Sequence, residues 1–112
     1  MFYLIIQLFK EKYEEEVLLA LTSAGIDRAT VTDNINLEKI VHSDIPIFAG
    51  VPSGSGEEKR FCKIFSAAVN DEHVVDDFLS ALKAGGVDFL QDDIGIIILL
   101  PAARILKKDS VE

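Results

Sequence analysis

The sequence is poor in cysteine and has no long apolar run. Its single cysteine, Cys62, cannot form an internal disulfide, which favours a reducing compartment, so we expect a cytoplasmic protein. The apolar start Phe2–Ile6 has no basic segment before it and is soon followed by Lys10. It is too short to cross a bilayer and wrongly flanked to direct export. We therefore expect no membrane insertion.

Basic residues are also scarce. The chain has 11 Lys and Arg against 19 Asp and Glu, which gives a formal net charge of −8. A surface of this charge repels phosphate backbones and anionic lipid headgroups. Nucleic acid is therefore not an expected partner.

The residues that most often bind metals or form covalent intermediates are few and scattered. His42, Cys62 and His73 have no metal-ligand spacing. Cys62 has no histidine near it in the sequence, and no serine occupies a nucleophile elbow. We therefore predict neither a metal site nor catalysis.

A seven-residue pattern occurs twice. Leu21–Asp27 recurs as Leu82–Asp88, and each copy ends an amphipathic segment that follows an apolar run. Two strand–helix units, each with a return strand, describe a duplicated βαβ-βαβ domain, in which a four-stranded antiparallel sheet has both helices on one face. We therefore predict one α+β domain of ferredoxin-like arrangement over residues 1–112.

The pattern of apolar residues places the individual elements. Apolar or alternating runs predict strands over residues 3–9, 29–32, 60–69 and 95–100. Helical spacing predicts one helix over 13–24 and a second helix that is capped by Asn70 or Asp71. Gly25 and the pair Gly85–Gly86 mark the helix ends, where glycine readily adopts a positive φ. The apolar stripes are Tyr13, Val17, Ala20, Leu21 and Ala24 in the first helix, and Val74, Val75, Phe78, Leu79 and Leu82 in the second.

The first and last strands are apolar on both faces. A sheet with helices on one side should have a polar far face, so the apolar residues Ile96, Ile98 and Leu100, or their alternate neighbours, indicate that the far face is covered too. Self-association would cover it. Two closed symmetric assemblies would do this: a trimer whose sheets line a common core, and a dimer that stacks two sheets face to face. We expect an obligate oligomer and favour the trimer.

A long irregular segment, from about Asn36 to Lys59, separates the second and third strands. It contains prolines and glycines, and loops of this length usually have a function or are disordered. Its large apolar residues would pack on a partner protein, a ligand or the body of the trimer, and we favour a functional contact over a passive linker. The candidate contact residues are Asp44, Ile45, Ile47, Phe48 and Gly50, together with Lys59 and Arg60. These last two either give the end of the segment a positive charge that takes part in the contact or only keep the start of the third strand soluble.

Several runs together resemble the PII signal-transduction family. They are Leu4–Lys10, Gly25–Thr32, Val69–Glu72, and Gly95–Pro101 with Ala103–Ile105, and they agree with that family in order, element length and loop placement. The resemblance implies a cytoplasmic trimer with adenine nucleotide in clefts between subunits. It also implies that the long segment is an effector arm that touches a target protein, such as a transporter or a metabolic enzyme.

The turn after the second helix departs from the PII pattern. There the family has phosphate-binding lysines, whereas residues 84–95 of this chain include Asp88, Asp92 and Asp93 and no basic residue. These carboxylates would repel a triphosphate by about a kcal/mol or more per close pair, so we expect ATP to bind weakly or not at all. Alternatively, the three aspartates are a solvated turn or a hard-cation site, and Gly85–Gly86 only a helix cap.

The resemblance to the PII family still allows a weaker mode of nucleotide binding. Ile5, Thr30 and the backbone from Ser66 to Ala68 would present a base-recognition surface, while Lys107 and Lys108 would supply positive charge. Gly85, Gly86, Asp88 and Gly95 would then border the ligand.

Three classes of function remain. The favoured one is a non-catalytic regulatory trimer that senses a small molecule and contacts a target protein through the long segment. An adenine nucleotide is one candidate for this small molecule. The second is a metal-binding trimer of the divalent-cation-tolerance type, which shares the fold and trimer of PII, although this chain lacks clustered His, Cys or Met ligands. An enzyme is the least favoured class.

Overall fold

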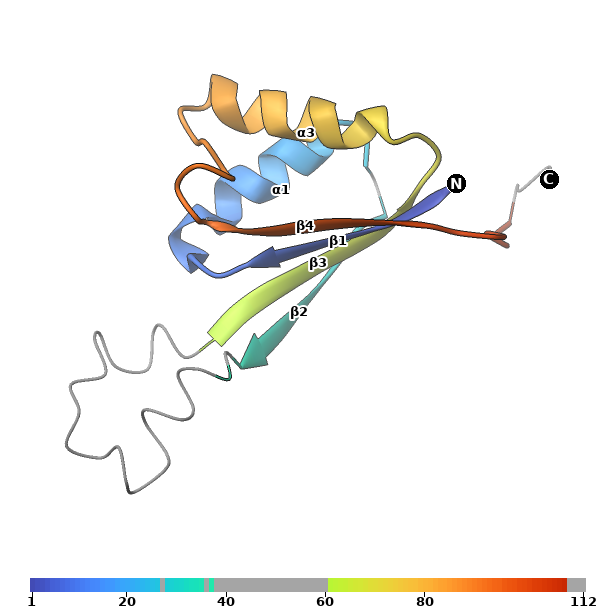
Figure 1. Cartoon of the computed structure of the whole chain (residues 1–112), viewed down its shortest axis with the longest axis horizontal. Coiled ribbons are helices and arrows are strands. Elements are labelled where there is room, and N and C mark those ends of the chain that lie inside the picture. Colours follow the sequence, from blue (N-terminus) through green and yellow to red (C-terminus); the bar gives the residue numbers. More distant parts are fainter. Residues whose placement is uncertain (27, 36, 38–60, 109–112) are drawn as a thin grey trace.

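The computed structural model describes residues 1–26, 28–35, 37 and 61–108. Its elements follow the order β1 (Phe2–Leu8), η1 (Glu11–Tyr13), α1 (Glu14–Ser23), β2 (Thr30–Ile35), β3 (Phe61–Val69), α3 (His73–Ala84) and β4 (Gly95–Pro101). The strands form one antiparallel sheet in the order β2-β3-β1-β4, and both helices lie on the same face of it (Figure 1). This is the predicted ferredoxin-like α+β fold.

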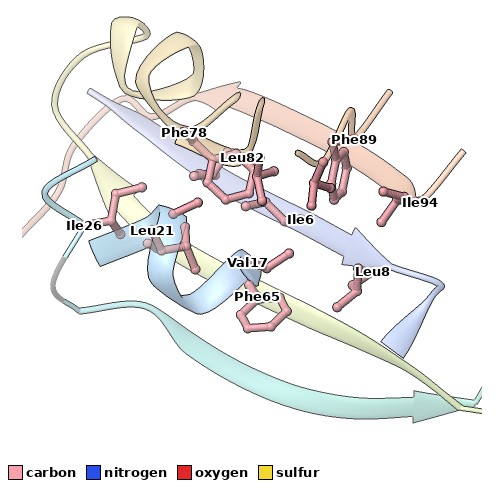
Figure 2. Close-up of a cluster of buried hydrophobic side chains, with 14 of the residues drawn as sticks. Ile6, Leu8, Val17, Leu21, Ile26, Phe65, Phe78, Leu82, Phe89 and Ile94 are labelled. Carbon is pink, nitrogen blue, oxygen red and sulfur yellow. The ribbon is translucent and has the colours of Figure 1, made fainter. Parts of the chain in front are cut away.

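The core lies between the helices and the sheet. Leu4, Ile6 and Leu8 alternate along β1 towards the helices and are almost completely buried. Their partners from α1, β3, α3 and the turn before β4 surround them (Figure 2). These partners are Val17, Ala20, Leu21, Phe65, Phe78, Leu82, Phe89 and Ile94. The predicted stripes of both helices therefore face the sheet.

The duplicated heptapeptide ends both helices in the same way. Gly25 has φ 81° and Gly86 has φ 85°, the left-handed conformation that glycine adopts most easily. The Ile26 amide donates to the Leu21 carbonyl at 3.0 Å, and the Val87 amide donates to the Leu82 carbonyl at 2.9 Å. These bonds satisfy helix-end carbonyls and bring an apolar residue back onto the core after each glycine. The repeated seven-residue pattern therefore reflects the same glycine cap at the C-terminal end of each helix.

The start of α3 matches one of the two predicted caps. The Asp71 carboxylate accepts a hydrogen bond from the His73 amide at 2.9 Å. This bond satisfies one of the amides that have no partner within the helix.

Strand β2 is longer than predicted and continues to Ile35 through Asp33 and Asn34, which are poor strand formers. An ion pair accounts for the extension. The Lys63 ammonium on β3 contacts the carboxylate of Asp33, its cross-strand partner, and lies 3.5 Å from a carboxylate oxygen of Glu14 on α1. Both carboxylates raise the pKa of Lys63, the Asp33 hydrogen bond most strongly. One lysine therefore links β2, β3 and α1.

The second face of the sheet is mostly apolar over β1 and β4, and on β3 it combines Ile64 and Ala68 with Ser66. We call it the open face, because within the described part of the chain neither helix lies on it (Figure 1). Tyr3 and Leu100, which are opposite each other on β1 and β4, are 44% and 47% exposed. The other side chains that alternate onto this face are Ile5, Gln7, Ile64, Ser66, Ala68, Ile96 and Ile98.

Candidate functional site

Three of the predicted ligand residues form one row across the sheet. Ser66 on β3 is directly opposite Ile5 on β1 and Thr30 on β2, and Ile5 is opposite Ile98 on β4. The hydroxyl oxygens of Thr30 and Ser66 lie 3.1 Å apart and share a hydrogen bond. The row therefore presents a hydroxyl pair beside two isoleucines on the open face. Ala68, two residues along β3, is exposed on the same face.

The turn between α3 and β4 brings together a second group of predicted residues. Gly85 and Gly86 are exposed, Asp88 is half-buried, and its carboxylate accepts a hydrogen bond from the Gln91 amide at 3.2 Å. Gly95 is buried at the start of β4. An added Cβ at Gly95 would overlap the carbonyl oxygen of Gln7 and lie 2.8 Å from Cζ of Phe89. Close packing of two strands and a ring therefore requires glycine at this position.

The structure adds one residue to this turn that the sequence did not suggest. The Lys10 ammonium donates to the Asp92 carbonyl oxygen at 2.8 Å, across 82 positions of sequence. The amides of Phe9 and Lys10 also donate to the Ile94 carbonyl, at 2.9 and 3.3 Å. A cation thus binds the backbone of the acidic turn. Only the pairing of β1 with β4 brings it there, so no local pattern could have indicated it.

The remaining predicted ligand residues, Lys107 and Lys108, lie far from that turn within one protomer. Both are exposed and follow the C-terminal end of β4, whereas residues 85–95 precede its N-terminal end. The strand has 7 residues, so its two ends are about 20 Å apart. Figure 1 shows the chain beyond β4 leaving the sheet at the end opposite to the α3–β4 turn. A ligand in contact with both groups must therefore bridge two copies of the chain.

An open groove of about 420 Å³ runs between α3 and β4 on the helix side of the sheet. Its apolar floor is formed by Val75 and Leu79 from α3 with Ile97 and Leu99 from β4, all half-buried. Glu72 and Asp76 border it near the start of α3 and are exposed. We call this feature the α3–β4 groove. It combines an apolar floor with an acidic rim.

The groups with nucleophilic or basic potential are far apart. Cys62 is 7% exposed near the start of β3, and burial, together with the nearby Glu11 carboxylate, raises the pKa of its thiol. His73 lies at the start of α3, beyond the opposite end of β3, and its Nδ1 is 3.7 Å from an Asp76 carboxylate oxygen. From Cys62 to Val69 the strand spans about 23 Å. The geometry therefore offers Cys62 no activation by His73.

Over residues 1–26, 28–35, 37 and 61–108, no group of three or more His, Cys, Asp and Glu side chains is placed to hold a metal ion. No helix among these residues has the length and apolar character needed to span a membrane.

The predicted partner-contact residues Asp44, Ile45, Ile47, Phe48, Gly50, Lys59 and Arg60 lie outside the described residues. Their flanks are described: Ile35 at the end of β2 pairs with Phe61 at the start of β3. Both ends of the segment therefore leave the same end of the sheet.

Comparison with known proteins gives no family for this chain. None of the protein-family models searched matches the sequence, and no curated protein sequence matches it either. The fold itself is the ferredoxin-like arrangement described above.

Proposed function

We propose that this protein is a non-catalytic regulatory module of the PII-like kind. In this proposal it forms a homotrimer through the open face, senses a small molecule at clefts between subunits, and contacts a target protein through the segment between β2 and β3. The ferredoxin-like fold is compatible with such proteins. Many unrelated proteins share this fold. The choice of a PII-like role among them is supported by the resemblance to the PII pattern of Leu4–Lys10, Gly25–Thr32 and Gly95–Pro101.

The open face is the observation on which the proposal mainly rests. It joins Tyr3, Ile5, Ile98 and Leu100 into an apolar surface over two neighbouring strands. Monomeric proteins seldom expose apolar patches of such continuity, whereas obligate interfaces are apolar like a divided core. Closed cyclic assembly would bury this surface in every copy.

The separation of the acidic turn from Lys107 and Lys108 supports the cleft as the place of ligand binding. These groups are about 20 Å apart in one copy, because β4 lies between them. Neighbouring copies in a ring can supply the two groups from different chains. The large distance between Cys62 and His73 is in turn the reason for proposing a non-catalytic role.

The assembly is tested by light scattering after size-exclusion chromatography at micromolar concentration. We expect a trimer for the natural chain and a folded monomer for Ile98→Glu, because a carboxylate at the centre of an apolar interface would be buried without a partner. Leu19→Glu is the matched control, since Leu19 on α1 is 63% exposed and lies on the helix side. A natural chain that is a soluble, folded monomer would contradict the proposal.

Nucleotide binding is tested by calorimetry with ATP, with and without magnesium. The turn carries three carboxylates, Asp88, Asp92 and Asp93, and the Lys10 ammonium beside it already has the Asp92 carbonyl as a partner, so we expect weak binding or none. Asp92→Lys should strengthen any binding about tenfold, as expected for removing one close repulsion and adding an attraction. Asp77→Lys, the same charge change on the exposed side of α3, should have little effect. A dissociation constant in the low micromolar range for the natural chain would contradict this expectation.

A further inference from the structure

The α3–β4 groove has features of a peptide-docking site. Strand β4 is the edge of the sheet and pairs only with β1 among the described strands. Ile97 and Leu99 point to the helix side but stay half-buried, because α3 covers them only in part. The groove is therefore an apolar surface beside an unpaired strand edge.

The acidic rim limits what this groove can accept. Glu72 and Asp76 are one turn apart on α3, and both carboxylates are exposed at the border of the apolar floor. His73 is the one basic side chain on this rim, 3.7 Å from Asp76. A complementary occupant needs an apolar side chain for the floor and basic side chains for the rim.

The chain itself contains a segment with this composition. Residues 102–108, which we call the C-terminal segment, include Arg104, Lys107 and Lys108 and have no acidic residue, and the next acidic residues of the chain are Asp109 and Glu112. Leu106, directly before the two lysines, is 70% exposed. In a chain with net charge −8, such a basic and apolar segment is conspicuous. It has no proline, so all its backbone amides can donate.

The C-terminal segment does not occupy the groove of its own chain. It continues past the end of β4, after the Ala102 amide donates to the Met1 carbonyl at 2.9 Å (Figure 1). Leu106, Lys107 and Lys108 are all exposed there. Thus each copy has one unfilled acidic groove and one exposed basic segment.

We propose that the α3–β4 groove binds the C-terminal segment of a second copy of this chain. Leu106 packs on the floor between Leu79 and Ile97, and Lys107 and Lys108 meet Glu72 and Asp76. The exchange repeats around a closed assembly, so every groove and every segment is used. This contact involves a surface on the helix side of the sheet and is separate from the open face.

Disulfide trapping between two different variants tests the proposal. Both variants have Cys62→Ala; one adds Leu79→Cys in the groove and the other adds Leu106→Cys in the C-terminal segment. We expect the mixture to form disulfide-linked dimers about tenfold faster than a mixture of Leu19→Cys with Leu106→Cys, because a disulfide needs its two Cα atoms within about 7 Å. Leu19 on α1 is exposed and outside the groove, so it reports random collision.

Two results of the trapping experiment would overturn the proposal. Equal rates for the two mixtures would show that the segment has no preference for the groove, as in an assembly formed through the open face alone. A chain with both Leu79→Cys and Leu106→Cys that closes only an internal disulfide would show that the segment binds its own groove.

Charge exchange provides an independent test on exposed residues whose replacement leaves the core intact. Glu72→Lys with Asp76→Lys in the groove variant should slow trapping about fivefold, because two attractive pairs become repulsive. Adding Lys107→Glu with Lys108→Glu to the other variant should restore the rate. Trapping that is unaffected by the first pair of changes, or not restored by the second, would overturn the proposal.

Discussion

Gly95→Ala is expected to lower the free energy of unfolding by about 3 kcal/mol or more, at the upper end of the usual cost of overpacking. The new methyl group would overlap the Gln7 carbonyl oxygen and press on the ring of Phe89. Neither neighbour can move easily. Gln7 lies in β1, which is paired on both sides, and Phe89 is 1% exposed. Against a typical total of about 5–15 kcal/mol, such a loss removes between about one fifth and three fifths of the stability.

Gly85→Ala is the matched control for this prediction. At Gly85 an added Cβ would lie 3.4 Å from the Leu82 carbonyl oxygen, an ordinary contact, and φ is −87°. We expect a change within about 0.5 kcal/mol, or a small gain from a less flexible unfolded chain. Denaturant unfolding of both variants measures the contrast. Equal losses at the two positions would show that the packing around Gly95 is not the cause.

The two glycines also differ in what they can reveal about ligands. Sequence reasoning placed both at the candidate ligand site, and that assignment stays a prediction. Because Gly85→Ala should leave the fold intact, any change in ligand binding by this variant reports on the site itself. Gly95→Ala cannot separate a binding defect from loss of structure.

Phe78→Ala is expected to cost about 3–5 kcal/mol, as for other fully buried aromatic side chains. Phe78 is 0% exposed and meets the Phe89 ring edge-on, with centroids 6.1 Å apart and an interplanar angle of 68°. Its loss opens a cavity between α3 and the sheet and removes this aromatic contact. Denaturant titration should show a lower midpoint with an unchanged slope.

Phe78→Leu is the control, since it keeps most of the buried apolar volume and should cost clearly less than the alanine change. If the two substitutions cost the same, the stabilisation would come from the aromatic pair with Phe89 rather than from filled volume. If neither has an effect, the assignment of Phe78 to the core is wrong.

Features set by local spacing were predictable from the sequence. Gly25 and Gly86 end their helices because a positive φ there needs glycine, and this requirement is readable one residue at a time. The buried pair Phe78 and Leu82 follows from helical periodicity in the same way. Two such units with their return strands were enough to give the ferredoxin-like fold.

Features set by distant neighbours were not predictable. The predicted strand ends at residue 32, yet β2 continues to Ile35, and Lys63 on the adjacent strand pairs with Asp33 there. Lys10 lies beside the Asp92 carbonyl only because β1 and β4 are neighbours. The candidate site was affected most. Ile5, Thr30 and Ser66 share a row only through the pairing of β1, β2 and β3, which periodicity could not show, whereas the predicted strand over residues 95–100 already separated Lys107 from the Gly85 turn.

The distance between the two ends of β4 would make ligand affinity depend on the concentration of the protein. If one ligand touches the Gly85 turn of one copy and Lys107 of another, it binds only assembled protein, and binding and assembly are thermodynamically linked. Its apparent affinity then falls when the protein is diluted below the dissociation constant of the assembly, and saturating ligand shifts free copies into the assembly. Such a protein would respond to its own abundance in the cell as well as to the concentration of its effector.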